Sequence, residues 1–235
     1  MEKNRKILLF GATGAIGQAI GTHFEQKSCD VIRIVRSTGK DKNLICWDPL
    51  SEDDKSGAAT VCAIGPYDAV VWAQGANCND SAYTVNASAH NEMYRANVLY
   101  IVQSLHFILS NKLLKQSARL CVISSIWQNI ARQNKYSYCI TKAALQGLVL
   151  SAANDLGKDG YLINAVMPGV IDTPMTRRNL SEEQLEKIVG ATQFGRLPAM
   201  QDVVNAVYSV CSESNTGLTG QFLQVDLGFS NVRVI

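Results

Sequence analysis

Short apolar runs alternate along the chain with stretches in which apolar residues recur at helical spacing. The helical stretches lie at 15–27, 90–111 and 136–157. Parallel strands that are covered on both faces by helices read as near-continuous apolar runs. The pattern therefore predicts an α/β fold, a doubly wound parallel sheet of about seven strands with helices on both faces. The predicted strands lie at 7–10, 31–35, 44–47, 69–72, 120–123, 162–166 and 221–225.

The predicted helix over 136–157 carries apolar residues around most of its circumference. A helix of this kind is buried on both sides. One side is expected to pack on the sheet, and the other to contact a second copy of the chain or, alternatively, a segment of the same chain. We expect a homodimer or homotetramer formed through 90–111 and 136–157. No linker or repeat interrupts the elements, so 1–235 is predicted to form a single domain.

The composition argues against several classes of function. The 235 residues are 47% hydrophobic and 18% charged, with a net charge of +2. The longest basic cluster, Arg177-Arg178, attracts nucleic acid weakly, and the apolar runs are far shorter than the roughly 20 residues that span a bilayer. The seven cysteines contain no C-x-x-C pair and the three histidines are isolated, so we expect reduced thiols and no metal site. A cytoplasmic protein without a nucleic-acid or membrane partner is expected.

A glycine-rich turn joins the first predicted strand to the first predicted helix. It reads G-x-x-G-x-x-G, with Gly11, Gly14 and Gly17. Gly11 permits a tight exit from the strand, Gly14 lets the backbone approach a pyrophosphate, and Gly17 lets the helix pack close to the sheet. Three glycines also make an ordinary turn, but their place between a strand and a helix favours a Rossmann-type dinucleotide site.

The residues at the end of the second predicted strand indicate which nicotinamide cofactor is bound. Enzymes that bind NAD place an Asp or Glu here, whereas an Arg accommodates the 2′-phosphate of NADP. The chain has Arg36, Ser37 and Thr38 at this point and no carboxylate. Arg36 can pair with a phosphate, although it can also be a solvated charge at a strand end. We therefore expect NADP(H) rather than NAD(H), with Asp48 near the adenine amino group.

Candidate reacting residues follow in the middle of the chain. Tyr138 and Lys142 are four residues apart in a predicted helix, so their side chains share a face. Ser125 closes the fifth predicted strand thirteen residues before Tyr138, and Asn97 lies in the preceding long helix. Taken singly, Ser125 reads equally well as a strand-end hydroxyl satisfied locally, and Asn97 as a helix residue bonded to backbone.

In these motifs the chain resembles the short-chain dehydrogenase/reductase family, in its shorter, single-domain branch, from about residue 6 to residue 230. Three segments depart from the family pattern: Ala15 replaces a glycine, Ala73-Gln74-Gly75 replaces Asn-Ala-Gly, and Leu227 replaces a glycine near the C-terminus. The matching segments are 11–17 (GATGAIG), Asp48, 73–75 (AQG), Asn97, 123–125 (ISS), 138–145 (YCITKAAL), 168–173 (PGVIDT) and 218–228 (LTGQFLQVDLG).

The resemblance implies a catalytic tetrad of Asn97, Ser125, Tyr138 and Lys142. Tyr138 is expected to be the general acid/base, with its pKa brought down by the ammonium of Lys142 together with a positive oxidised nicotinamide. Ser125 is expected to bond the substrate oxygen, Lys142 the nicotinamide ribose, and Asn97 a water. The expected cofactor-binding residues are Gly11, Thr13, Gly14, Ala15, Ile16, Gly17, Arg36, Ser37, Thr38, Asp48, Ala73, Gln74, Gly75, Tyr138, Lys142, Pro168, Gly169, Ile171 and Thr173.

The segment 174–197 is expected, by the same resemblance, to form a lid over the substrate. A capping-box pattern at 181–184 predicts that a short helix begins there. The predicted substrate residues are Ser125, Trp127, Gln128 and Met175. Arg132, Arg177 and Arg178 hint at an acidic or phosphate-bearing substrate, but exposed arginines are usually solvated.

The function predicted is an NADP(H)-dependent oxidoreductase that transfers a hydride between nicotinamide and a small ketone or secondary alcohol. One alternative is a non-catalytic NADP(H)-binding or redox-sensing protein, for which Tyr138 beside Lys142 has no purpose. The other is a sugar-nucleotide epimerase or dehydratase. Those enzymes carry a large C-terminal substrate domain, and 93 residues follow Lys142 here.

Overall fold

A seven-stranded parallel sheet forms the centre of the computed structural model, which describes residues 4–36, 44–51 and 53–232. The strand order is β3-β2-β1-β4-β5-β6-β7, so the chain winds outward in both directions from β1 and β4. This confirms the predicted α/β fold. The strands are β1 (Lys6–Phe10), β2 (Asp30–Val35), β3 (Leu44–Cys46), β4 (Tyr67–Trp72), β5 (Leu114–Ile123), β6 (Leu162–Pro168) and β7 (Phe222–Val225).

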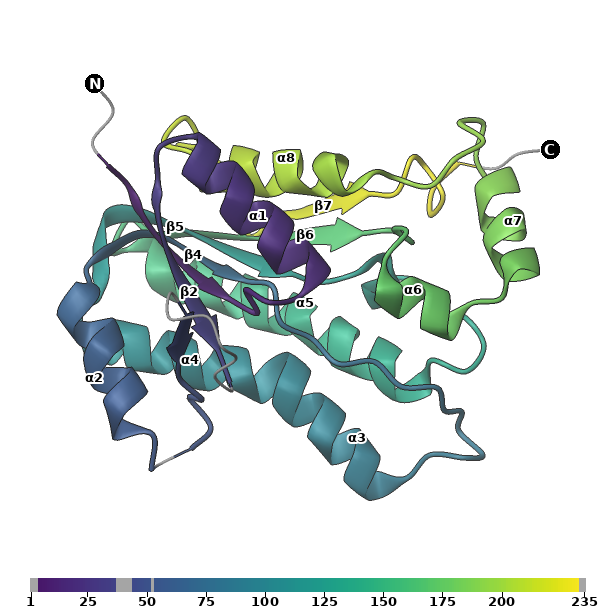
Figure 1. Ribbon diagram of the computed structural model, residues 1–235, viewed down its shortest axis with the longest axis horizontal. Helices are drawn as coiled ribbons and strands as arrows, with labels where there is room; N and C mark the ends of the chain where they lie inside the picture. Colours follow the sequence, from purple (N-terminus) through teal and green to yellow (C-terminus); the bar gives the residue numbers. More distant parts are fainter. Residues whose placement is uncertain (1–3, 37–43, 52, 233–235) are drawn as a thin grey trace.

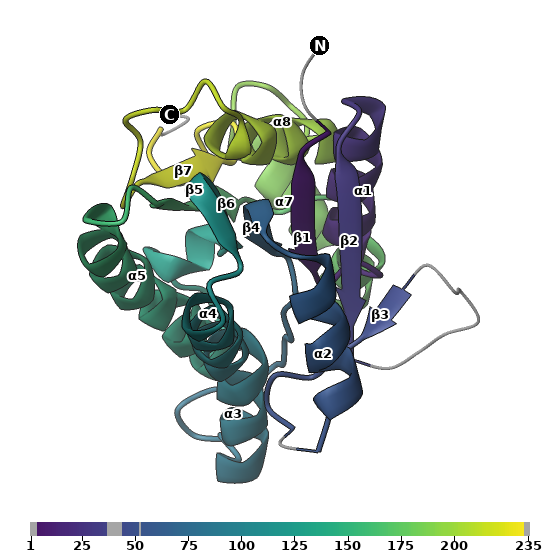
Figure 2. The same ribbon diagram turned by 90° about the vertical axis from the view of Figure 1, so that its left-hand side faces the viewer.

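Helices cover both faces of this sheet (Figures 1 and 2). α1 and α8 pack side by side on one face, and α4 and α5 lie on the other. The helices are α1 (Ala15–Gln26), α2 (Lys55–Ile64), α3 (Ala87–Tyr94), α4 (Tyr100–Ser110), α5 (Tyr136–Gly157), α6 (Pro174–Asn179), α7 (Glu182–Gly190) and α8 (Met200–Cys211). α7 begins with the predicted capping box, in which Ser181 and Gln184 bond each other's backbone.

Two of the predicted elements differ most from the sequence prediction. The helix expected over 90–111 begins at Ala87 and is interrupted by a π-helical segment, Arg95–Leu99, between α3 and α4. β5 begins at Leu114 rather than at residue 120. Its first half carries Lys115, Gln116 and Ser117, and the last two are exposed. An apolar run cannot reveal a strand whose opening residues face solvent.

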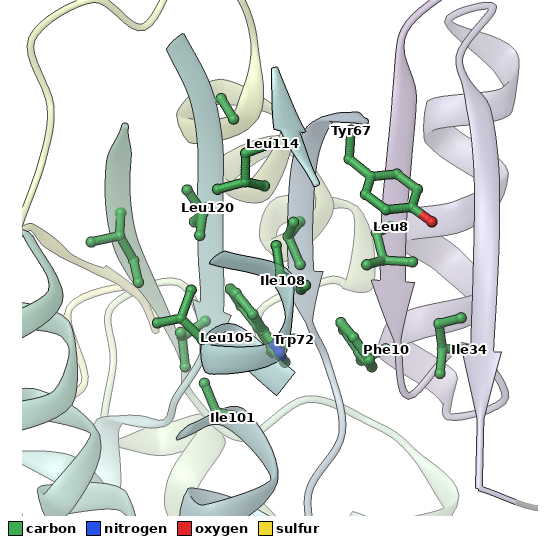
Figure 3. Packing of buried hydrophobic residues seen from close by; sticks show 14 of the residues in the cluster. Leu8, Phe10, Ile34, Tyr67, Trp72, Ile101, Leu105, Ile108, Leu114 and Leu120 are labelled. Atoms are coloured by element: carbon green, nitrogen blue, oxygen red, sulfur yellow. The ribbon is translucent and has the colours of Figure 1, made fainter. Parts of the chain in front are cut away.

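Residues of β1 show why the strands are apolar throughout. Leu8 and Phe10 belong to the core on the side of α4 and α5, while Ile7 and Leu9 belong to the core beneath α1 and α8. All four are fully buried. Phe10 stacks on Trp72 at 5.9 Å between ring centres and lies beside Ile34 (Figure 3). The sheet is therefore buried on both faces.

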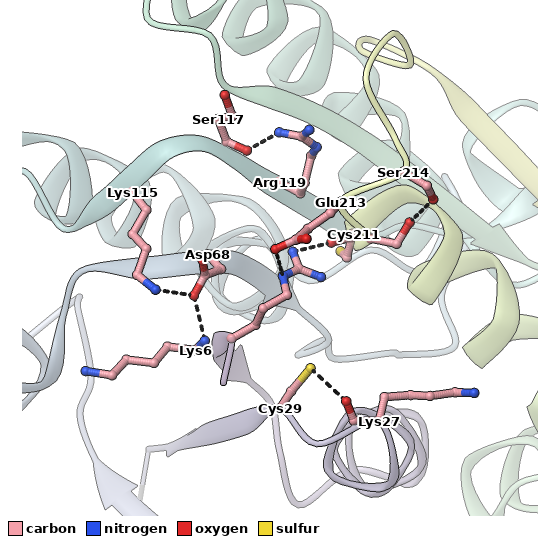
Figure 4. A network of polar contacts seen from close by, with 12 residues as sticks. Lys6, Lys27, Cys29, Asp68, Lys115, Ser117, Arg119, Cys211, Glu213 and Ser214 are labelled. Atoms are coloured by element: carbon pink, nitrogen blue, oxygen red, sulfur yellow. Dashed lines mark hydrogen bonds and ion pairs between the residues drawn. The ribbon is translucent and has the colours of Figure 1, made fainter. Parts of the chain in front are cut away.

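Polar contacts gather at the amino-terminal edge of the sheet (Figure 4). Asp68 accepts hydrogen bonds from the Lys6 backbone and the Lys115 ammonium, each at 2.7 Å. Arg5 donates to the carbonyl of Cys211 at 2.7 Å and pairs with Glu213. These contacts join strand ends to neighbouring segments. The opposite, carboxyl-terminal edge is the one where open α/β sheets bind ligands.

The outer side of α5 carries solvent-exposed apolar side chains. Ile140 is 39% exposed and Leu150 49% exposed in the single chain. Assembly through this helix, as a dimer or tetramer, remains a prediction. No helix within the described part of the chain is both long enough and apolar enough to cross a bilayer.

Candidate active site

The glycine turn leaves β1 and opens α1 at the carboxyl edge of the sheet. Gly11 has a φ of +71°, and a Cβ there would lie 2.4 Å from the backbone nitrogen of Gln74. A Cβ on Gly17 would lie 2.2 Å from the carbonyl oxygen of Gly11. Both positions therefore require glycine. Gly14 is the N-cap of α1 and provides no side-chain cap, so the first turn of the helix presents backbone N–H groups that can bind an anion.

A groove of about 470 Å³ runs along this turn. Both polar atoms of the Gln74 amide are buried and have no hydrogen-bond partner among the described residues. A buried, unpaired amide and an uncapped helix end fit a bound dinucleotide, because its ribose hydroxyls and phosphates would satisfy them. The predicted cofactor residues that line the groove are Gly11, Thr13, Gly14, Ala15, Ile16, Arg36, Ala73, Gln74, Gly75 and Thr173.

Other predicted cofactor residues lie elsewhere. Ser37 and Thr38 fall outside the described residues. Asp48 does not line the groove, and its carboxylate accepts a hydrogen bond from the backbone of Leu50 at 3.0 Å. Gly17 packs against Gly11 beneath the turn. Tyr100, from the start of α4, lines the groove and was not predicted, because its sequence context is that of a buried helix face.

A second cavity, of about 140 Å³, lies beyond the end of this groove. Ile16, Thr173 and Met175 line both spaces, so the two meet at these residues. The predicted residues lining the cavity are Ile16, Ser125, Trp127, Tyr138, Pro168, Gly169, Ile171, Thr173 and Met175. Gln128 is not among them. It is buried, and its amide oxygen accepts a hydrogen bond from Ser124 at 2.7 Å.

Tyr138 lies in the first turn of α5, facing the ends of β5 and β6. Lys142, one turn further along, is 4% exposed, and its ammonium lies 5.7 Å from the centre of the Tyr138 ring. That ammonium donates to the carbonyl of Ile123 at 3.1 Å. A Cβ placed on Gly75 of the groove would lie 3.8 Å from it. Tyr136, the other tyrosine of this turn, is 45% exposed.

The protonation of these groups differs from the prediction. Burial raises the pKa of Tyr138 to about 12, although a hydrogen bond from Ser125 opposes the rise. Burial also lowers the pKa of Lys142 to about 8. A net lowering of the Tyr138 pKa is therefore not found, because desolvation is the larger effect. The phenol is protonated at neutral pH.

Asn97 lies in the π-helical segment and is 1% exposed. Its side-chain oxygen accepts a hydrogen bond from the backbone N–H of Ala76 at 2.7 Å. Its amide nitrogen donates to the carbonyl of Ala76 at 3.1 Å and to the hydroxyl of Thr141 at 2.9 Å. Asn97 thus joins the loop after β4 to α5 between Tyr138 and Lys142.

Sequence reasoning overlooked Lys135, which precedes Tyr138 by three residues and is 2% exposed. Its ammonium lies 2.7 Å from the side-chain oxygens of Asn77 and Asn79, and 5.9 Å from the centre of the Tyr138 ring. A lysine next to a helix start is ordinarily solvated, so nothing in its local sequence marks it. The available signal was the pair of asparagines far upstream, Asn77 and Asn79, whose side chains hold the buried ammonium.

Comparison with known proteins identifies the protein family to which the chain belongs. Residues 52–230 match the family model described as enoyl-(acyl carrier protein) reductase. The fold and the match are those of NAD(P)-dependent oxidoreductases built on a Rossmann-type sheet. The chain belongs to the short-chain dehydrogenase/reductase family, as the resemblance implied.

Individual relatives are distant but match along nearly the whole chain. An uncharacterized oxidoreductase of Bacillus subtilis, YmfI, is 25% identical over 96% of this chain and 99% of its own. The 3-oxoacyl-[acyl-carrier-protein] reductase FabG of Escherichia coli is 26% identical over 94% of this chain and 95% of its own. A gluconate 5-dehydrogenase of Burkholderia cenocepacia, solved in complex with NADP and tartrate, superposes with a TM-score of 0.89 at 16% identity, covering 98% of this chain and 96% of its own.

Proposed function

We propose that the protein transfers a hydride between NADP(H) and a small ketone or secondary alcohol, with Tyr138 as the general acid/base. The observation that carries this proposal is the position of Ser125 and Tyr138 in a cavity that opens onto the glycine-rich groove. A carbonyl group in this cavity lies next to a phenol, a hydroxyl and, one helical turn away, a buried ammonium. Each of these has a distinct task in carbonyl reduction.

The bound cofactor would supply the hydride to the carbonyl carbon. In the reduction, Tyr138 donates its phenolic proton to the carbonyl oxygen, so that an alcohol forms and a phenolate remains. Ser125 donates a hydrogen bond to the same oxygen while negative charge develops there. Lys142 stabilises the phenolate electrostatically, and it would also hold the nicotinamide ribose, since its ammonium lies close to Gly75 of the groove. Asn97 acts as a positioning residue, because its amide joins Ala76 to α5.

The high pKa of Tyr138 supports its role as a proton donor. A protonated phenol is the form that reduction needs, and it is the form present at neutral pH. Alcohol oxidation needs the phenolate, so that direction is expected to accelerate as the pH rises. A non-catalytic sensor would have no use for these groups. A sugar-nucleotide epimerase or dehydratase is also disfavoured, because a reductase and a dehydrogenase match this chain nearly end to end.

NADP(H) is the proposed form of the cofactor. Arg36, exposed at the end of β2, lines the groove, and no carboxylate is found among the described residues that line it. A guanidinium at this place can pair with a 2′-phosphate, whereas an Asp or Glu would repel it. The NADP seen in the gluconate 5-dehydrogenase structure agrees with this proposal.

The Tyr138→Phe variant tests the proposed reaction. Removal of the phenolic oxygen takes away the proton donor but keeps the ring that packs in the cavity. We expect the turnover of a panel of small ketones with NADPH to fall by at least 10³-fold, a range consistent with loss of a general acid. The Kd for NADPH, measured by fluorescence, should change less than threefold. The exposed Tyr136→Phe change is the matched control, and equal turnover in Y138F and wild type would refute the assignment.

A further inference from the structure

Two cations and no carboxylate line the cavity beside Tyr138. Lys135 and Arg132 both contribute to its wall. None of the described residues that line this cavity is an aspartate or a glutamate, and no ion pair found among the described residues includes either cation. A small cavity with two unpaired positive charges is costly to maintain in a folded protein.

The direct hydrogen-bond partners of Lys135 are polar but neutral. Its ammonium donates to Asn77 and Asn79 at 2.7 Å and to the carbonyl of Cys78 at 3.1 Å. A fourth oxygen, that of the Asn179 amide, lies 3.3 Å away. The ammonium has three protons to donate but four acceptors around it. Asn179 is the most distant acceptor, so its contact is the one most easily exchanged. Asn179 ends α6, in the segment predicted to be the lid.

The nearest acidic group does not neutralise these cations. The carboxylate of Asp80 is held by the backbone N–H of Ser137 at 3.0 Å and by the Ser137 hydroxyl, and it does not line the cavity. The guanidinium of Arg132 lies over the Trp127 ring at 5.9 Å from its centre. Burial lowers the pKa of both cations, that of Lys135 to about 8 with a further contribution from the charge of Arg132, and the negative charge of Asp80 opposes the lowering at Lys135 only in part.

The arginines of the lid segment do not share this position. Arg177 pairs with Asp172 at 2.6 Å and with Glu182 at 3.8 Å on the surface. Arg178 lines the cofactor groove instead. Lys135 and Arg132 are therefore the charges that a bound substrate meets.

We propose that the substrate carries an anionic group, a carboxylate or a phosphate, close to its carbonyl, and that Lys135 binds this group directly with Arg132 as a second contact. The proposal rests on the proposed function and specifies its substrate class. The anion would replace Asn179 at the ammonium, which connects substrate binding to α6. Because Lys135 and Ser125 line the same cavity of about 140 Å³, the anionic group and the carbonyl are separated by only a few bonds.

Matched acids and esters test this proposal. The substrates are 2-oxobutanoate, 4-oxopentanoate, 5-oxohexanoate and 2-oxoethyl phosphate, with the methyl esters of the three acids as neutral counterparts. Wild type is expected to reduce at least one anionic substrate with a kcat/KM at least tenfold above that of its ester or of acetone. Lys135→Met should lower kcat/KM for the anion at least tenfold more than that for neutral ketones, mainly through KM. Lys135→Arg should recover part of the loss.

The control is Lys158→Met, which removes an exposed lysine just beyond the end of α5. Carboxylate and phosphate substrates are compared separately, so the data also identify which anion is recognised. The proposal is overturned if wild type reduces esters as well as acids, or if K135M affects both equally. In either case the reduction of neutral ketones would leave the proposed oxidoreductase function standing.

A binding measurement keeps the proposal testable where no substrate is reduced. Glutarate and inorganic phosphate, which cannot be reduced, are titrated by calorimetry into the protein saturated with NADP⁺ and into the protein alone. Binding of either probe to wild type that weakens at least tenfold in K135M and in Arg132→Met, but not in K158M, supports the anion site independently of turnover. The same affinity in K135M and wild type, or no binding at all together with no reduction of the anionic substrates, refutes it.

Discussion

Three ionisable side chains, Tyr138, Lys142 and Lys135, occupy a small volume with little access to water. The Tyr–Lys pair could be predicted because both residues lie on one helix, four positions apart, where sequence spacing determines geometry. Their pKa values could not, because desolvation depends on residues from β5, β6 and the loop after β4. Lys135 could not be found either, since its amide partners come from 56 to 58 positions upstream.

Leu227 gives a second example at the residue scale. The family resemblance places a glycine there, and the backbone indeed has the left-handed φ of +55° that favours glycine. Asp226 next to it holds the backbone N–H groups of Gly228 and Ser230. The turn therefore keeps its conformation although the residue type differs, which the sequence alone could not indicate.

The buried ammonium of Lys142 leads to a pH prediction for stability. Its pKa in the folded protein is about 8, against an ordinary value of 10.5. Between pH 8 and 10.5 the folded state releases this proton while the unfolded state retains it, so the free energy of unfolding gains a contribution that increases with pH. Below pH 8 both states hold the proton and the contribution is constant.

Urea unfolding of wild type and Lys142→Met at pH 7.5 and pH 10 measures this contribution. The difference in unfolding free energy, wild type minus variant, should rise by about 1–3 kcal/mol between the two pH values. Groups other than Lys142 are common to both proteins, so their contributions cancel in the difference. A difference that stays flat or falls with pH would show that Lys142 is not buried as a cation.

At the scale of elements, patterning located each strand of the sheet but not its polar ends. β5 extends back to Leu114 past exposed residues, and the long helix contains a π-helical segment that places Asn97 against Ala76. Helix periodicity does not reveal one extra residue per turn. The glycine turn was predictable in detail, because the steric demands at Gly11 and Gly17 follow from its place between β1 and α1.

The end of β2 yields a prediction about cofactor choice. Arg36→Ala removes the only cation that the described end of β2 presents to the groove. The Kd for NADPH is expected to rise at least tenfold, consistent with loss of a charge-assisted contact, while that for NADH changes less than threefold. Arg196→Ala, at an exposed position outside the groove, is the control. An unchanged ratio of the two Kd values would argue against recognition of the 2′-phosphate by Arg36.

At the scale of the whole molecule, the sheet order places the ends of β1, β4, β5 and β6 along one edge. The turn after β1, the loop after β4, Ser125 after β5 and Pro168-Gly169 at the end of β6 thereby surround one continuous space. Parallel strands connected through helices bring residues together that lie more than a hundred positions apart. The order of motifs in the sequence was sufficient to predict this arrangement, because each motif follows a strand.

Isotope transfer tests the central claim most directly. NADPH carrying deuterium at C4 of the nicotinamide, prepared separately in each stereochemical form, is incubated with the protein and a reducible ketone, and the alcohol is analysed by mass spectrometry. The account predicts that one of the two forms delivers a single deuterium to the former carbonyl carbon, and that Tyr138→Phe abolishes the transfer while still binding NADPH. Product that contains solvent hydrogen at that carbon with both forms, or transfer that is undiminished in Y138F, would contradict it.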